Sequence, residues 1–266
     1  MNYSVLMAVY AGDNPDFLKQ SINSMINQTK KTNDFVIIKD GILTHELEKV
    51  LNYYEKKYDG IFNIIQINEN VGLGQALNFG ILKCKNELIA RMDADDISLP
   101  NRCELQILEF KRNNNLDVVG SSVDEFSNDP GKVQSRRVVP SKHNEILKFA
   151  KYRDPFNHPS VMYKKSSVVK VGNYREFRKN QDTDLWIRML HAGCQSKNIE
   201  NSLLLFRFDE KTLNKRTNWQ NTKLLIKIRF DAFKIGFNTL FEFLIVSQVQ
   251  LVQYIMPGFI QEAVYK

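Results

Sequence analysis

The sequence is poor in cysteine, with three in 266 residues. Cys84, Cys103 and Cys194 lie far apart and show no CxxC or cysteine–histidine ligand spacing. This scarcity argues against a disulfide framework and against a zinc site, because both need clustered ligands. We expect buried or spare thiols in a reducing cytoplasm.

Long apolar runs and glycine-rich phosphate motifs are also missing. No segment reaches the roughly 18 uninterrupted apolar residues of a membrane span. The apolar opening, residues 1–12, lacks a basic leader and is too short for a signal-peptide core. We therefore expect the chain to be made and kept inside the cell. The absence of GxGxxG, GxxxxGKS and GxxxxGKT argues against dinucleotide and P-loop phosphate binding.

Charge is abundant but unevenly distributed. The net charge is +7, yet residues 1–130 hold 13 basic and 19 acidic residues, whereas residues 131–180 hold 13 basic and three acidic. An acidic half suits a metal ion, and a basic segment suits phosphates, an anionic substrate or an anionic membrane face. A merely solvated basic surface is the open alternative, and we expect no nucleic-acid partner.

Short apolar runs alternate with helix-like segments through the first half of the chain. Helix starts are indicated at residues 13–16, which offer N-caps and a first-turn proline, at Thr44 and at Pro100. This alternation predicts an α/β fold with a parallel sheet flanked by helices. The apolar runs lie at residues 5–10, 35–38, 62–67, 88–92 and 118–119.

Polar residues follow three of these runs, at residues 11–13, 40–41 and 93–96. Ligands of open parallel sheets lie beyond the carboxyl ends of the strands, so the three groups should converge on one site. Later in the chain, residues 181–192 predict a short amphipathic helix that ends at Gly193.

The stretch RMDADD, residues 91–96, puts three carboxylates into four positions. Like charges at this spacing resist joint ionisation unless a cation or strong donors lie among them. Mg²⁺ and Mn²⁺ prefer such oxygen ligands and complete their shells with water and substrate phosphates. The motif predicts a metal–diphosphate site, with an Asp-rich turn that caps the helix after Pro100 as the structural alternative.

Six segments together resemble the family 2 glycosyltransferases, above all the bacterial enzymes that build capsular and exopolysaccharide repeat units. The resemblance spans roughly residues 3 to 216 in consistent order. It implies a GT-A fold with a Rossmann-like, mostly parallel sheet, a nucleotide-sugar donor such as a UDP-sugar, Mn²⁺ or Mg²⁺, and inversion at the anomeric carbon. The segments are SVLMAVYAG (4–12), IIKDG (37–41), NENVGLGQALNFG (68–80), ARMDADDISLPNR (90–102), PFNHPSVMYKKS (155–166) and QDTDLWIRML (181–190).

The resemblance also implies roles for single residues. Asp93 would face the donor sugar or ribose, Asp95 would bind the metal between the two phosphates, and Asp96 could cap the next helix. The remaining nucleotide contacts would come from Val9 and Tyr10 near the base, Asp40 accepting a hydrogen bond from the base, Asn70 and the turn from Gly72 to Gly74, and Arg91 near the diphosphate.

The catalytic Glu-Asp pair of the family maps to Gln181-Asp182, so that Asp182 would be the general base. Gln181 departs from the pattern, because an amide stands where the family usually has a second carboxylate. Asp184 could instead be the working carboxylate, or simply a helix-end charge favoured by the macrodipole.

Other residues have two open interpretations. His158 could contact the acceptor or the diphosphate, or could be a structural histidine in a proline-rich turn. Lys215 and Arg216 could close over the diphosphate or lie solvated. The Gln-x-x-Arg-Trp motif of processive members is absent, which favours addition of a single sugar.

The chain divides into a catalytic domain, residues 1–216, and a helical segment, residues 217–266. Within the catalytic domain we expect a nucleotide-sugar and metal half at 1–120 and an acceptor half at 121–216. The segment after Trp219 mixes basic and large apolar residues, with polar interruptions that argue against a bilayer span. It predicts either a helix in the membrane interface or a helical hairpin packed on the catalytic domain or on a second subunit.

The leading hypothesis is an inverting, metal-dependent glycosyltransferase in capsule or surface-glycan synthesis. Its acceptor would be a saccharide or a lipid-linked oligosaccharide, which favours a peripheral position at the inner face of the cell membrane. One alternative is a membrane-bound assembly scaffold with a decayed site, supported by Gln181 alone. A weaker one is a phosphotransferase of the haloacid dehalogenase type, whose nucleophilic Asp normally ends the first core strand, whereas Asp93 follows the fourth.

Overall fold

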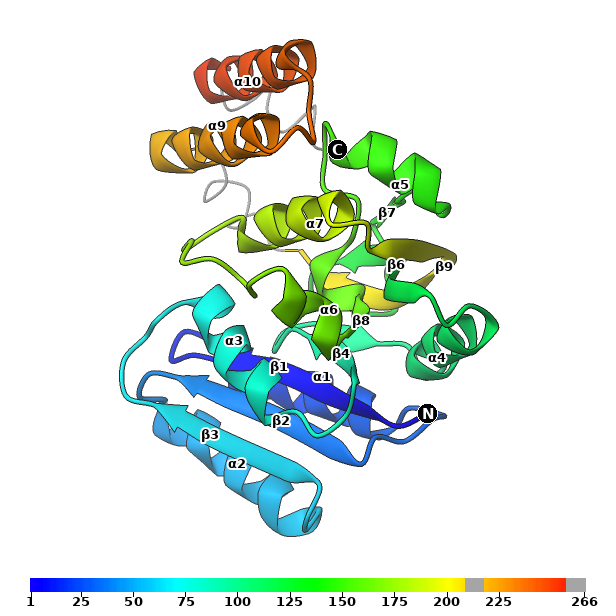
Figure 1. Ribbon diagram of the computed structural model, residues 1–266. Coiled ribbons are helices and arrows are strands. Elements are labelled where there is room, and N and C mark those ends of the chain that lie inside the picture. The colour runs from blue at the N-terminus through cyan, green and yellow to red at the C-terminus, as the bar shows by residue number, and fades with distance from the viewer. Residues whose placement is uncertain (209–217, 257–266) are drawn as a thin grey trace.

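The computed structural model describes residues 1–208 and 218–256. A mixed sheet of nine strands forms the centre of the described chain, in the order β3-β2-β1-β4-β8-β6-β9-β5, with β7 paired to β6 (Figure 1). The strands are β1 (Tyr3–Val9), β2 (Asp34–Asp40), β3 (Phe62–Ile67), β4 (Leu88–Met92), β5 (Ile97–Ser98), β6 (Leu116–Phe126), β7 (Ser135–Arg137), β8 (Met162–Lys164) and β9 (Gln195–Arg207).

The first four strands of the sheet are parallel, as the alternating pattern predicted. β1 and β2 are buried along almost their whole length, as expected of parallel strands covered on both faces. Beyond β4 the sheet is mixed, because β8 runs antiparallel to both β4 and β6 while β6 and β9 are parallel. The mostly parallel arrangement therefore describes the first half of the sheet, and the α/β class holds for the whole.

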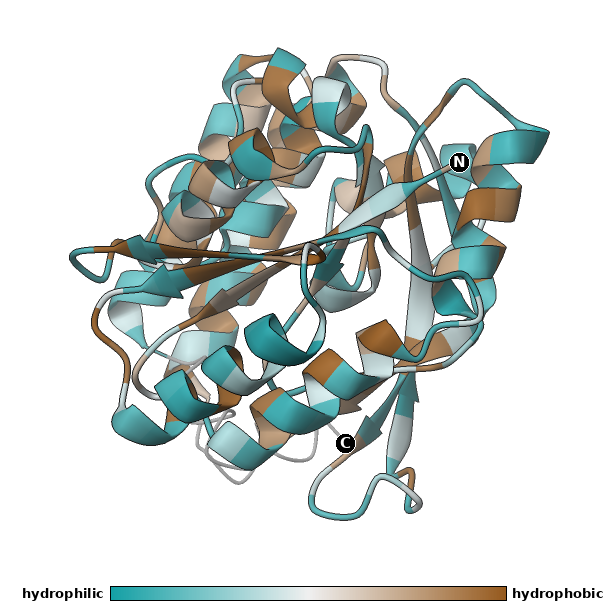
Figure 2. Cartoon of the chain, turned by 90° about the horizontal axis from the view of Figure 1, so that it is seen from below, coloured by the Kyte–Doolittle hydropathy of each residue, from teal (hydrophilic) through white to brown (hydrophobic). Residues whose placement is uncertain are grey.

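Helices cover both faces of the sheet over separate hydrophobic cores. Each helix contributes one apolar side, and Figure 2 shows hydrophobic and hydrophilic residues mixed along the helices. One face carries α1 (Pro15–Ile26), α2 (His45–Lys57) and α4 (Arg102–Arg112). The other carries α3 (Leu73–Lys83), α5 (His143–Ala150), α6 (Lys165–Lys170) and α7 (Gln181–His191), and the 3₁₀ turn η1 (His158–Ser160) precedes β8.

Local sequence signals set several helix starts. Asn14 caps α1 by accepting hydrogen bonds from the backbone N–H groups of Asp16 and Phe17, and Thr44 caps α2. α3 begins after Gly72, whose φ of +87° is a conformation that favours glycine. The starts of α1 and α2 follow the predicted caps, whereas the start of α3 after Gly72 was not predicted from the sequence.

Two helices form the C-terminal part of the described chain, α9 (Trp219–Lys234) and α10 (Leu240–Ile255). α9 packs against α7 and α10 packs against α9, so both lie at the end of the molecule away from α2 and β3 (Figure 1). Among residues 1–208 and 218–256, no helix is long and apolar enough to cross a membrane.

Candidate active site

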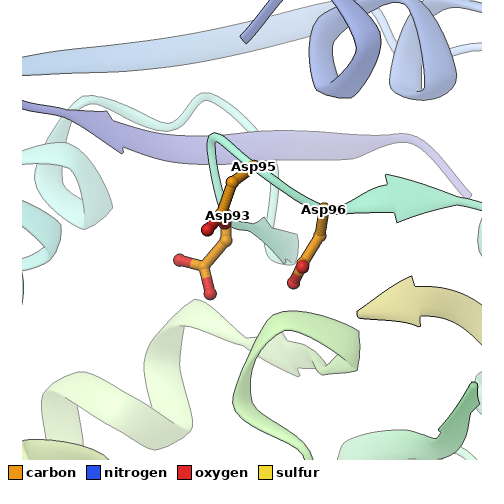
Figure 3. A group of neighbouring side chains, drawn as sticks. All are labelled: Asp93, Asp95 and Asp96. Atoms are coloured by element: carbon orange, nitrogen blue, oxygen red, sulfur yellow. The ribbon is translucent and has the colours of Figure 1, made fainter. Parts of the chain in front are cut away.

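Three carboxylates gather on the loop between β4 and β5. The side chains of Asp93, Asp95 and Asp96 leave this loop on the same side (Figure 3), and one oxygen from each lies within 4.8 Å of the others. Enclosure by the surrounding protein and the Asp93 charge raise the pKa of Asp95 to about 6, although its side chain reaches solvent. Such crowding of negative charge is what a bound cation relieves.

Asp96 is the buried member of this group. One carboxylate oxygen accepts a hydrogen bond from the Arg207 backbone N–H at 2.8 Å, and the other has no hydrogen-bond partner among the described residues. Burial and the charges of Asp95 and Asp93 raise its pKa well above the ordinary value. Asp96 does not cap α4, whose N-cap is Asn101, so the structural alternative of an Asp-rich helix cap is wrong.

The donor set therefore fits a hard divalent cation such as Mg²⁺ or Mn²⁺. All available ligand atoms are carboxylate oxygens, and an unpaired oxygen of Asp96 lies buried beside the two other carboxylates. Asp95 is the most exposed of the three and is the carboxylate most open to a ligand.

Arg91 reaches the site through Asp93. Its side chain is 1% exposed, and its two terminal nitrogens form ion pairs with the two oxygens of Asp93, one of them at 2.6 Å. A guanidinium held in this bidentate way fixes the orientation of its carboxylate. In this structure the Arg91 charge pairs with Asp93 inside the protein, and its expected position near a diphosphate stays a prediction.

Arg207, at the end of β9, supports the same loop and was not found from the sequence. Its Nε donates to the backbone oxygen of Asp95 at 2.9 Å, and its guanidinium stacks on Phe17 and Phe126. No local motif marks this residue, which lies 111 positions after Asp96 in the chain.

The end of β1 adds a fourth carboxylate to this region. Asp13 accepts a hydrogen bond from the Tyr10 backbone N–H at 2.9 Å, and burial together with the charges of Asp95 and Asp93 raises its pKa to about 7. Tyr10 is 47% exposed and its ring lies over Gly12, where a Cβ would come within 2.5 Å of the ring. Val9 is buried in the core, so its predicted place near the donor base can involve only its backbone.

Asp40, at the end of β2, holds the loop that starts α3. Its carboxylate accepts hydrogen bonds from the backbone N–H groups of Val71 and Gly72 at 2.7 and 3.0 Å and from the Asn70 side chain at 3.1 Å. Arg178, which the sequence did not single out, donates to the Asn70 side chain at 2.8 Å. The hydrogen bond from a nucleotide base to Asp40 stays a prediction.

Asp182 lies in the first turn of α7 and is partly exposed. Burial and the charge of Asp154 raise its pKa to about 6, while Arg91 acts in the opposite direction. Tyr174, whose hydroxyl is 2.8 Å from Nε2 of His158, feels the charges of both Asp182 and Asp93. The predicted base and the carboxylate loop therefore belong to one electrostatic environment.

Asp184 is held differently. Its two oxygens pair with Arg175 at 3.2 Å and with Arg188 at 2.7 Å, and the side chain is buried. Both oxygens of Asp184 are thus occupied by guanidinium donors, which leaves them less available to an acceptor hydroxyl than those of Asp182. Between the two candidate bases, the geometry favours Asp182.

Gln181 is buried against the start of α3. A Cβ added at Gly74 would lie 3.1 Å from the Gln181 side chain, and the Gln181 amide oxygen has no partner among the described residues. A carboxylate at this place would be a second buried negative charge beside Asp182. Lys215 and Arg216, the predicted clamp, lie outside the described residues.

Comparison with known proteins gives the family of the chain. The Glycosyl transferase family 2 model matches residues 4–178. The chain is 34% identical over 265 residues to UDP-Gal:alpha-D-GlcNAc-diphosphoundecaprenol beta-1,3-galactosyltransferase of Escherichia coli, covering 99% of this chain and 95% of that protein. It is 31% identical over 265 residues to the amylovoran biosynthesis glycosyltransferase AmsE of Erwinia amylovora, covering 98% of both.

Among solved structures, the mannosyltransferase PcManGT of Pyrobaculum calidifontis in complex with GDP-Man and Mn²⁺ has a TM-score of 0.65 to this chain. The two share 12% identity over 88% of this chain and 64% of that one. This similarity shows the fold, and the sequence relatives show the family. The chain belongs to glycosyltransferase family 2 and is a glycosyltransferase with a GT-A fold.

Proposed function

We propose that this glycosyltransferase moves one sugar, with inversion, from a UDP-sugar to a lipid-linked saccharide during surface-polysaccharide synthesis. The observation that carries the proposal is Asp182, a carboxylate with a pKa of about 6 in the same electrostatic environment as Asp93. The E. coli relative supports the UDP-sugar and the diphosphate-lipid acceptor, because its name specifies both and it matches almost end to end.

The chemistry follows from the charges of these residues. An acceptor hydroxyl is a poor nucleophile, and Asp182 would take its proton during attack on the anomeric carbon, which contributes about 10² to 10⁴ in rate. Asp95, with Asp93 oriented by Arg91, would hold the divalent cation. When bound, the cation would offset the negative charge that grows on the departing diphosphate.

Inversion is supported by the state of the carboxylates on α7. A double displacement, as in retaining glycoside hydrolases, needs two carboxylates, one as nucleophile and one as acid/base. Asp184 is tied to Arg175 and Arg188, and residue 181 is an amide, which leaves Asp182 for one direct displacement. Attack on the opposite face from the leaving group inverts the anomeric centre.

The family match and the geometry also bear on the two alternatives. A phosphotransferase of the haloacid dehalogenase type disagrees with the family and with Asp93 at the end of β4. The scaffold alternative rests on Gln181, whose burial against Gly74 gives the amide a packing role that requires no loss of activity. If the protein bound UDP with Mn²⁺ but transferred no sugar, the scaffold alternative would be favoured.

A membrane-facing position is proposed for α10. Its exposed side chains are largely apolar, and its one charged residue, Glu242, pairs with Lys151. On the neighbouring α9, exposed lysines accompany exposed aromatic residues, a composition typical of helices that lie in a bilayer interface with anionic lipid. The exposed apolar and aromatic residues of α10 are Leu240, Phe241, Leu244, Val249, Leu251, Val252, Tyr254 and Ile255, beside the polar Gln248, and the exposed lysines and aromatic residues of α9 are Trp219, Lys223, Lys227, Phe230 and Lys234.

The test of transfer uses the full chain, Mn²⁺, a panel of UDP-sugars and a synthetic saccharide linked to a diphosphate lipid. We expect one UDP-sugar to raise the melting temperature, since ligand binding stabilises the folded state. That donor should give a product heavier by one sugar, with an anomeric configuration opposite to the donor's by NMR. A product of retained configuration would overturn the inverting mechanism. If none of the UDP-sugars in the panel supported transfer, the choice of donor would be overturned.

The membrane proposal is tested by sedimentation with vesicles that contain phosphatidylglycerol. The intact chain should co-sediment, and high salt should weaken the binding by screening the lysines. Phe241→Ser combined with Val252→Ser should abolish it. A stable dimer in solution that these substitutions dissociate, without vesicle binding by the wild type, would show that a second subunit covers α10.

A further inference from the structure

Asn180, the residue directly before α7, has a left-handed backbone conformation and is bonded to a helix of the C-terminal segment. The φ of Asn180 is +53°, in the left-handed region that few residues other than glycine, asparagine and aspartate adopt. Its side chain makes no cap bond to α7 and instead donates to the Asn221 side chain on α9 at 2.6 Å. Asn221 is 9% exposed and Asn180 is half-buried, so the bond is partly shielded from water.

A second contact from α9 comes close to the environment of Asp182. Arg229 is buried, and its Nη1 donates to the backbone oxygen of Ala150 at 2.6 Å. Its positive charge interacts with the negative charge of Asp154, and the Asp154 charge raises the pKa of Asp182. A charge on α9 therefore acts on a carboxylate that raises the pKa of the predicted base.

A third contact reaches the other side of the same turn. Arg175 bridges Asp184 of α7 at 3.2 Å and Asp231 of α9 at 3.7 Å. Thus one helix of the C-terminal segment bonds to the residue before the Gln181-Asp182 pair and shares Arg175 with Asp184, and its Arg229 charge interacts with Asp154. A helix that served only as an anchor would need none of these polar contacts.

We propose that Asn221 is a positioning residue for the general base, which makes α9 part of the catalytic unit. By fixing Asn180, it sets the direction in which α7 begins and hence where the Asp182 carboxylate points. The inference rests on the proposed role of Asp182. It replaces the expectation of a self-sufficient catalytic domain at residues 1–216 with one that needs α9.

The test is a double-mutant cycle on Asn180→Gly and Asn221→Ala. Glycine at 180 accepts the left-handed backbone but removes the donor, and alanine at 221 removes the acceptor. Each single variant should lower kcat by about tenfold or more, because small misplacements of a reacting group cost up to about 10²-fold. The Kd for UDP should stay unchanged. The double variant should lose no more than either single one, since both remove the same bond.

Two further variants separate positioning from general damage. Asn221→Asp retains the acceptor oxygen and should restore kcat to within about twofold, an outcome that follows if one bond carries the effect. Gln220→Ala, an exposed neighbour on the same helix, should behave as wild type. Wild-type kcat in Asn221→Ala, or losses that multiply in the double variant, would overturn the inference while the proposed function stands. Absence of transfer by the wild type would overturn the function itself.

Discussion

Nδ1 of His158 lies 3.9 Å from Oδ2 of Asp182, and Nε2 on the other side of the ring is 2.8 Å from the Tyr174 hydroxyl. Burial and the nearby Arg91 charge lower the pKa of His158 well below its ordinary value, so the ring is neutral near pH 7. A neutral imidazole forms no ion pair with the carboxylate. Asp182 therefore retains the basicity that burial and Asp154 give it.

Substitution of the base should affect chemistry and spare binding. Asp182→Asn keeps the size of the side chain and removes the proton acceptor. We expect the single-turnover rate at saturating donor to fall by about 10² or more, with unchanged affinity for UDP and Mn²⁺. A variant that transfers sugar at the wild-type rate would exclude Asp182 as the base.

The rate should depend on pH through the same carboxylate. Asp182 must be deprotonated to act, so kcat/KM should rise with pH through a midpoint near 6. Asp154→Asn removes a negative charge that raises this pKa, and the midpoint should move to lower pH. Arg91, His158 and Tyr174, the other groups around Asp182, are unchanged in this variant.

A matched control for the pH profile is Asp59→Asn, because Asp59 is exposed between α2 and β3, at the far end of the molecule (Figure 1). This variant should keep the wild-type midpoint. A midpoint that Asp154→Asn leaves in place, or moves upward, would contradict the electrostatic link between Asp154 and Asp182.

Substitutions of two carboxylates on the β4–β5 loop should weaken UDP binding to different extents. Asp95→Ala should weaken UDP binding in Mn²⁺ by more than about tenfold, since even indirect support of a metal is worth about 10 to 100-fold. Asp96→Asn should lose less, because Asp96 is the buried member of the group and an amide oxygen can still accept from the Arg207 backbone and face the cation. Calorimetry in Mn²⁺ and in EDTA measures the UDP affinity of each variant with and without the metal. Equal Mn²⁺ dependence in Asp95→Ala and wild type would refute the assignment.

Asp184 should matter for folding. Asp184→Asn leaves the largely buried Arg188 without its anion, and breaking such a pair costs about 3 to 5 kcal/mol. Urea unfolding should show a loss near the low end, because the amide keeps one acceptor oxygen. Asp231→Asn, which breaks a longer and more exposed pair with Arg175, should cost less than about 1 kcal/mol. A larger loss in Asp231→Asn would reverse this ranking of the two ion pairs.

The sequence predicted the parts of the fold that depend on local patterns. The alternation of apolar runs and caps located β1 to β4 and their helices, because each element carries its own signal. The expected strand at residues 118–119 lies near the start of β6, which extends from Leu116 to Phe126. Its polar stretch is buried, and Asn157 and Ser160 from the η1 turn bond to the backbone of Ser121. Such long-range pairing leaves no period in the sequence.

The site was predictable where a short motif carried it. The aspartates at 93, 95 and 96 and the pair at 181 and 182 lie on contiguous segments, so a family pattern could find them. The choice between Asp182 and Asp184 as the base could not be made from the sequence, because the ion pairs of Asp184 with Arg175 and Arg188 are seen only in the folded structure. Arg207 and Asn221 act from the far end of the chain, and no spacing rule links them to the loops they hold.

The departure at Gln181 allows a final prediction. Gln181→Glu restores the residue that the resemblance leads us to expect. It also buries a second carboxylate beside Asp182, in a place where the Gln181 amide oxygen has no partner among residues 1–208 and 218–256. A neighbouring negative charge disfavours ionisation, so the midpoint of kcat/KM against pH should move above 6, and the rate near pH 6 should fall while the rate near pH 8 largely recovers. Gln181→Met, which has similar volume and no charge, should keep the wild-type midpoint. The pH profiles of the two variants, measured with the same donor and acceptor, decide the matter: an unmoved midpoint in Gln181→Glu would mean that residue 181 does not share the electrostatic environment of the base.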